Sequence, residues 1–227
     1  MHDKFLFFIA LFTGGITGLL ISLIANKTVC SVRNKYKMTP VLPNTKDIPE
    51  EPSLTDLLQG STLVVLCCIV SLVSAIQFGI NLEWAVGILF SATLLLLAVV
   101  DLRTHFIPDM LVLPAILIGT IFSLRILGTD PYDMTLGAIV ASCSALLLRK
   151  IYAMMSGKIP VGWGNVKLLI CCGAVSGLYG LPKLFFVAFS MACLWIIARA
   201  ILRINTNTDY IPIGPCLIAG TFFQMFF

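Results

Sequence analysis

The sequence is dominated by long apolar runs, each about as long as a helix must be to cross a bilayer. Such a helix needs about 20 predominantly apolar residues. The eight runs cover residues 5–25, 61–80, 84–100, 110–127, 134–152, 165–181, 184–203 and 211–226. They are continuous and do not alternate in polarity, which excludes an outer-membrane β-barrel. The sequence therefore predicts an all-α, polytopic membrane helix bundle with about eight transmembrane helices.

Composition agrees with a membrane protein. The chain is 59% apolar and 11% charged, whereas soluble domains average about 45–50% apolar and about 25% charged residues. The net charge of +4 is small and scattered, so membrane lipids are expected partners and nucleic acid is not. No small-x-small cleavage site follows the first run. We therefore expect that run to remain as a helix and not to be removed as a signal peptide.

Basic residues predict the topology, because lysine and arginine are retained on the cytoplasmic side. With the first loop placed inside, twelve of the fifteen basic residues fall at cytoplasmic positions. Only Lys4, Arg125 and Lys183 fall outside. Both ends of the chain are then periplasmic, and the loops after the first, third, fifth and seventh runs are cytoplasmic.

The polar segment 26–60 is predicted to be an extended cytoplasmic loop within a single membrane domain that covers 1–227. It holds too little apolar material for a core of its own. Of the eight cysteines, only Cys30 lies in this segment, and no two cysteines form a C-x-x-C pair. We interpret the cysteines as small packing residues and expect no metal site.

Two polar segments stand out, because charged groups near a membrane core are costly and often functional. In the first, Asp101 ends the third run at the predicted cytoplasmic face. Pro108 can open the next helix, with Asp109 in its first turn, where the helix dipole favours a negative charge. Taken alone, Asp109 is more simply a helix cap, and Asp101 an interfacial residue.

The second segment is Gly162-Trp163-Gly164-Asn165-Val166-Lys167-Leu168, at the start of the sixth run and at the same predicted face. Its two glycines permit close approach of another backbone, and Asn165 could cap the helix. Trp163 is interpreted as an interface anchor. Periodicity alone does not show that the two segments touch.

Two pairs of glycines have the G-x-x-x-G spacing that is typical of close helix packing in membranes. They are Gly14 with Gly18, and Gly173 with Gly177.

The two polar segments resemble the motifs of a known family, the type IV prepilin peptidases. Asp101 to Asp109 resembles its D-x-x-x-x-x-I/L-P-D/N segment, and Gly162 to Leu169 is similar to its G-x-G-D-x-K-L segment. Residues 211–215 resemble its I-P-F-G-P helix opening. The resemblance implies a GxGD-type membrane aspartic endopeptidase of the bacterial inner membrane. Such an enzyme removes the basic leader of prepilins or pseudopilins, in type IV pilus or type II secretion systems, at the cytoplasmic face.

The resemblance also implies site residues. The catalytic pair would be Asp101 and the residue at position 165. The motif and substrate-positioning residues would be Gly162, Gly164, Lys167, Pro108 and Asp109. Two neighbouring carboxylates share one proton, so that the ionised one activates water while the protonated one polarises the scissile carbonyl.

Asn165 departs from the family pattern, in which this position is aspartate. An amide cannot take up and return a proton, and loss of such a group costs about 10²–10⁴-fold in rate. We therefore expect this chain to be catalytically inactive. Two explanations remain open: a deliberate Asp-to-Asn change, made to trap substrate or stabilise the protein, and a natural pseudoenzyme.

The first cytoplasmic loop is a second departure. Many family members carry a four-cysteine zinc module there, whereas segment 26–60 holds only Cys30. Zinc is not expected, and S-adenosylmethionine would be a cofactor only if the chain is bifunctional and N-methylates its product. The alternative function is a non-catalytic scaffold that binds prepilins. A small transporter ranks last, because the runs carry almost no charge at mid-membrane depth.

Overall fold

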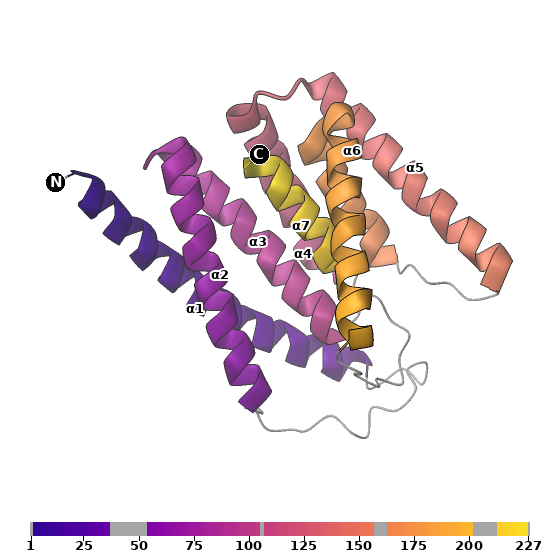
Figure 1. The fold of residues 1–227 in the computed structure, drawn as a ribbon, viewed down its shortest axis with the longest axis horizontal. Coiled ribbons are helices and arrows are strands. Elements are labelled where there is room, and N and C mark those ends of the chain that lie inside the picture. The colour runs from indigo at the N-terminus through magenta and orange to yellow at the C-terminus, as the bar shows by residue number, and fades with distance from the viewer. Residues whose placement is uncertain (1, 37–53, 105–106, 157–162, 202–212, 227) are drawn as a thin grey trace. The chain divides into compact units, whose positions relative to one another are not determined.

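The computed structural model describes residues 2–36, 54–104, 107–156, 163–201 and 213–226, and nearly all of these residues lie in helices (Figure 1). The predicted all-α class is confirmed. The helices are α1 His2–Tyr36, α2 Leu54–Phe78, α3 Leu82–Thr104, α4 Asp109–Phe122 with its π-helical continuation η2 Ser123–Leu127, α5 Pro131–Ser156, α6 Trp163–Ile201 and α7 Ile213–Phe226.

Six helices in the described part of the chain are long and apolar enough to cross a membrane. They are Ile9–Ser31, Ser61–Phe78, Leu82–Thr104, Asp109–Leu127, Pro131–Ile151 and Trp163–Ala198. The chain is therefore a multi-pass membrane protein. The predicted count of about eight is not confirmed. The runs 165–181 and 184–203 both fall in α6, which the non-helical Gly177 divides inside the first of them. α7 has only 14 residues, fewer than the roughly 20 that a full crossing needs.

The segment 26–60, predicted to be a loop, is helical at both ends. α1 continues to Tyr36 and α2 begins at Leu54. The basic residues that follow the first run do not end its helix, because lysine and arginine are good helix formers. The middle of the segment, 37–53, lies outside the described residues.

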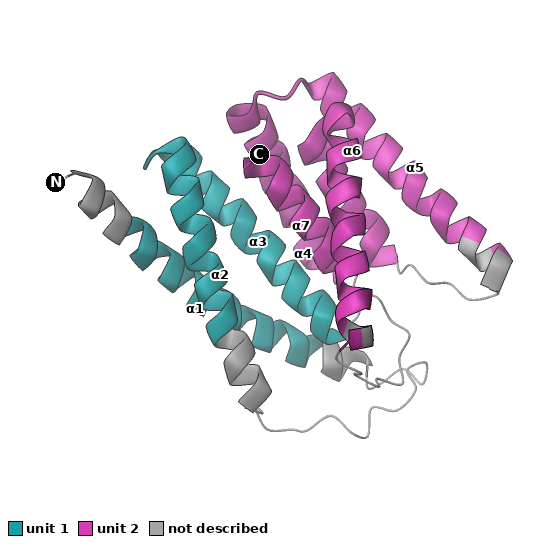
Figure 2. Ribbon diagram, viewed as in Figure 1, with its two compact units in different colours: residues 1–104 teal, residues 105–227 magenta. Residues whose placement is uncertain are grey.

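The chain forms two compact units, 1–104 and 105–227, shown in teal and magenta in Figure 2. One domain over 1–227 remains a prediction, and each unit is described by itself. Unit 1 contains α1, α2 and α3. Unit 2 contains α4, η2, α5, α6 and α7.

In unit 1, α1 and α2 pack closely through the first glycine pair. A methyl group on Gly14 would lie 2.7 Å from the Cα atom of Cys68, and one on Gly18 would lie 2.7 Å from the Cα atom of Val64. The predicted close packing at this pair is confirmed. α3 joins the same contact, because the indole Nε1 of Trp84 donates to the backbone oxygen of Ser71 at 3.2 Å.

The second glycine pair brings α5 and α6 together in unit 2. A methyl group on Gly173 would lie 2.6 Å from the backbone oxygen of Gly137, and one on Gly177 would overlap the carboxylate of Asp133. Close packing at this pair is therefore also confirmed.

α6 is broken at Gly177, whose φ of 64° and ψ of 175° are not helical. The backbone groups that such a break leaves open are satisfied by side chains from other helices. Leu178 N–H donates to Asp133 Oδ1 at 3.1 Å, and Ser123 Oγ donates to the backbone oxygen of Val175 at 3.2 Å. This matters in a membrane, where an unsatisfied backbone group costs several kcal/mol.

Neighbouring glycines in α1 provide a matched test of the packing. We expect Gly14→Ala to lower the free energy of unfolding in detergent by about 1–3 kcal/mol, because the new methyl group meets backbone and must force the helices apart. Gly15 has open space around it, so Gly15→Ala should be neutral or stabilising by up to about 1 kcal/mol. Equal effects of the two substitutions would show that α1 and α2 are not in this contact.

Candidate active site

Asp101 lies in the last turn of α3, in unit 1. Its side chain is 1% exposed, whereas Leu102 beside it is 44% exposed. Val100 and Leu97 are fully buried, so the carboxylate sits at the end of the most deeply buried stretch of the helix. Carboxylates in such places are rare, because removal from water penalises the charged form.

The end of α3 is tied to α1 by a polar contact that the sequence did not indicate. Arg103 Nη1 donates to Asn26 Oδ1 at 2.6 Å. Arg103 also lies in the last turn of α3, where the helix dipole favours a cation. The polar residues that end the first and third runs therefore meet at one end of unit 1.

In unit 2, the second motif forms the first turn of α6. Asn165 is the third residue of that helix, inside its first turn, so it does not occupy the expected cap position. The side chain is 5% exposed, and its Oδ1 atom has no hydrogen-bond partner among the described residues. A buried polar atom without a partner is uncommon and usually has a functional or solvent-related explanation.

Part of the first motif packs directly on the second. A methyl group on Gly164 would lie 2.8 Å from Ile107 Cβ and 3.3 Å from its backbone N and O. Only glycine at 164 allows Ile107 to come this close. The sequence analysis did not identify Ile107 as a contact residue. Only its position in the first motif, just before Pro108, could have indicated this contact. Gly162 lies outside the described residues.

The two motifs are also joined by an ion pair. Lys167 Nζ lies 2.6 Å from Asp109 Oδ1, and the two side chains are 42% and 62% exposed. Pro108 is the extended residue that caps α4, with φ −73° and ψ 138°, and Asp109 lies in the first turn as predicted. The cap position belongs to Pro108, so the carboxylate of Asp109 is available to Lys167.

A third contact places the end of α5 at the same end of unit 2. The guanidinium carbon of Arg149 lies 4.3 Å from the ring centroid of Trp163, a cation–π arrangement. The start of α4, the end of α5 and the start of α6 therefore meet, and they bring Asp109, Arg149 and Lys167 to the same end of the unit. In the described part of the chain, no group of three histidine, cysteine, aspartate or glutamate residues could hold a metal ion.

Comparison with known proteins places both motifs in one family match. A family model described as the type IV leader peptidase family matches residues 88–197. This range contains Asp101 to Asp109 and Gly162 to Leu168. The resemblance predicted from the two motifs is therefore confirmed.

Several curated relatives are named prepilin leader peptidase/N-methyltransferase. The relative from Neisseria gonorrhoeae is 30% identical, over 62% of this chain and 48% of its own length. The one from Pectobacterium carotovorum subsp. carotovorum is 32% identical, over 63% and 50%. The one from Escherichia coli (strain K12) is 26% identical, over 71% and 72%. The chain spans about half the length of the first two relatives. No solved structure matches it.

The ion pair between the motifs can be tested by a double-mutant cycle with Asp109→Asn and Lys167→Met. Because both side chains are half exposed, we expect a coupling free energy of about 1 kcal/mol or less, weakening as salt is added. The charge swap Asp109→Lys with Lys167→Asp should recover most of the coupling. Lys150→Met, which removes an exposed cation from the same end of unit 2, is the control. Strict additivity of the two single changes would mean that the pair contributes nothing.

Proposed function

We propose that this chain has the architecture of a membrane aspartic endopeptidase that processes prepilins or pseudopilins, with Asp101 and position 165 as its catalytic pair. The observation that carries this proposal is the contact between the motifs in unit 2, where Ile107 packs on Gly164 and Asp109 pairs with Lys167. The family match over both motifs and the names of the relatives support it.

Short sequence separations from the contact between Ile107 and Gly164 support the pairing. Asp101 lies six residues before Ile107 in the sequence, and Asn165 directly follows Gly164, the residue that Ile107 touches.

The burial of the two positions suits the proposed chemistry. Asp101 is 1% exposed and Asn165 is 5% exposed. Two carboxylates in such surroundings could not both ionise cheaply, so they would hold one proton between them. The ionised carboxylate would take a proton from water, while the protonated one would donate a hydrogen bond to the scissile carbonyl oxygen.

With asparagine at position 165, the chain lacks the second carboxylate that this proton transfer requires. The amide of Asn165 can donate to a peptide carbonyl and accept from a peptide N–H, but it cannot carry the proton. We therefore propose that the present sequence binds a prepilin segment without cleaving it. This observation also favours the second candidate, a non-catalytic prepilin-binding scaffold. The native gene at codon 165 distinguishes a deliberate change from a natural pseudoenzyme.

For the location we propose the bacterial inner membrane, with the site at the cytoplasmic face. The distribution of basic residues supports this orientation. The relatives' names include N-methyltransferase, and S-adenosylmethionine would be required only if this chain shares that second activity. We propose peptidase architecture alone, because segment 26–60 holds a single cysteine, Cys30.

Reversal at position 165 tests the proposed site. Asn165→Asp should raise cleavage of prepilins in proteoliposomes by at least about 10²-fold, because it restores a group that can carry a proton. The double variant Asp101→Asn with Asn165→Asp should be as inactive as the starting chain. A folded Asn165→Asp protein that cleaves no prepilin would remove the peptidase interpretation and leave the scaffold.

A further inference from the structure

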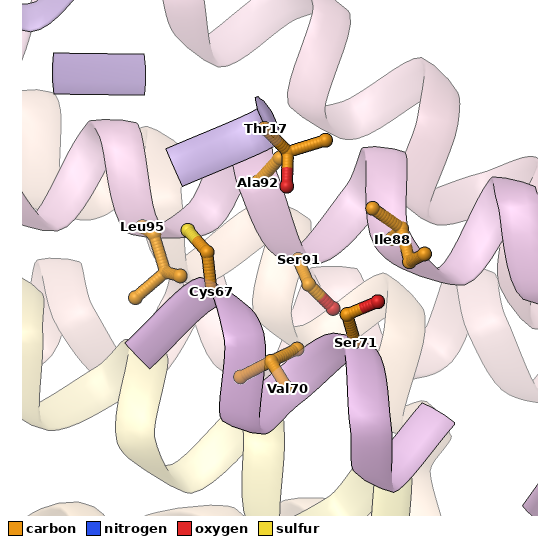
Figure 3. A pocket seen from close by; sticks show the side chains of 8 residues that line it. All are labelled: Thr17, Cys67, Val70, Ser71, Ile88, Ser91, Ala92 and Leu95. Carbon is orange, nitrogen blue, oxygen red and sulfur yellow. The ribbon is translucent and has the colours of Figure 1, made fainter. Parts of the chain in front are cut away.

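A small cavity lies among the three helices of unit 1 (Figure 3). Its volume is about 10 Å³, close to what one water molecule requires. It is lined by side chains from α1, α2 and α3: Thr17, Cys67, Val70, Ser71, Ile88, Ser91, Ala92 and Leu95. Most of this lining is apolar, but each helix contributes one hydroxyl group.

The hydroxyl group from α3 is the unusual one. Ser91 is 1% exposed, and its Oγ atom has no hydrogen-bond partner among the described residues. Hydroxyl groups in helices commonly donate to a carbonyl three or four residues back. Thr93, two residues further along α3, does so at 2.7 Å from the oxygen of Phe90. The hydroxyl of Ser91 therefore lacks the partner that its neighbour has.

The other two hydroxyl groups already donate their protons to backbone oxygens. Thr17 Oγ1 donates to the backbone oxygen of Thr13 at 2.9 Å, and Ser71 Oγ donates to that of Ala10 at 2.8 Å. Ser71 Oγ also lies 3.4 Å from the hydroxyl oxygen of Thr13, whose own proton goes to the backbone of α1. A hydroxyl oxygen that has donated its proton still has lone pairs and can accept. The cavity thus offers one unused donor and two acceptors. A ligand that matches them must accept one hydrogen bond and donate two.

We propose that this cavity holds one ordered water molecule, which accepts from Ser91 Oγ and donates to Thr17 Oγ1 and Ser71 Oγ. Three hydrogen bonds are typical of a buried water. Water fits better than an ion, because no charged group lines the cavity. The water joins α1, α2 and α3 and so fixes the rotation and depth of the helix that ends in Asp101.

The expected depth of the cavity in the membrane also supports a bound water. Ser91 lies ten residues before Asp101, which corresponds to about 15 Å along a helix. If Asp101 marks the edge of a hydrocarbon core about 30 Å thick, Ser91 lies near its middle. Bulk solvent and headgroups are absent at that depth, so the partner of the Ser91 hydroxyl must be a protein group or a trapped water.

A double-mutant cycle tests the shared water in the full chain. Ser91→Ala and Thr17→Val remove hydroxyl groups that lie on different helices and line the same cavity. We expect their effects on the unfolding equilibrium constant to be non-additive by about threefold or more. The matched control pairs Ser91→Ala with Thr28→Val, because Thr28 lies on α1 and donates to the backbone oxygen of Ile24 in the same way but does not line the cavity. That control cycle should be additive.

An experimental structure in lipid at a resolution that shows water provides the second readout. A peak within hydrogen-bonding distance of Ser91 Oγ, Thr17 Oγ1 and Ser71 Oγ is the expected result, and it should vanish in Ser91→Ala. An empty cavity, with Ser91 turned to bond a carbonyl of its own helix, would overturn the proposal. Additive effects in both cycles would overturn it as well. Neither outcome depends on whether the chain is a peptidase.

Discussion

The structure depends on one constraint: inside a bilayer every polar group needs a partner within the protein. The break in α6 shows how the chain meets it. Gly177 takes a backbone conformation that ends the helix, and Asp133 and Ser123 accept and donate the hydrogen bonds that the break leaves open. The same constraint concentrates the remaining charge at helix ends. Functional polar groups in this chain are therefore expected where helices begin and end.

The contact between the two motifs follows from that placement. Pro108 opens α4 and Trp163 opens α6. Both helices start at the same end of unit 2, because Ile107 packs on Gly164 and Asp109 pairs with Lys167. Gly164 then admits Ile107 against its backbone, because it has no side chain of its own. Two segments far apart in sequence thereby become one surface, and Asn165 is part of it. A substitution at Gly164 would disturb the proposed site without touching a catalytic group.

Periodicity and residue chemistry predicted much of this fold from the sequence. The apolar runs indicated an all-α membrane protein, the glycine pairs indicated close packing, and Pro108 indicated where α4 starts. Three features depend on tertiary contacts that have no local signature. These are the break in α6 at Gly177, the unsatisfied hydroxyl of Ser91, and the contact of Ile107 with Gly164. The motif order showed which segments mattered, but only the fold showed which of their residues touch.

Crosslinking of positions 101 and 165 is the most direct measurement of the central claim. Asp101→Cys and Asn165→Cys would be introduced after the eight natural cysteines are replaced. The pair Asp109→Cys and Lys167→Cys, whose parent side chains are in contact, is the positive control. If the two positions form one site, a short bifunctional reagent should link 101 to 165 in native membranes. Linkage of the control pair without linkage of 101 to 165 would contradict a shared catalytic site.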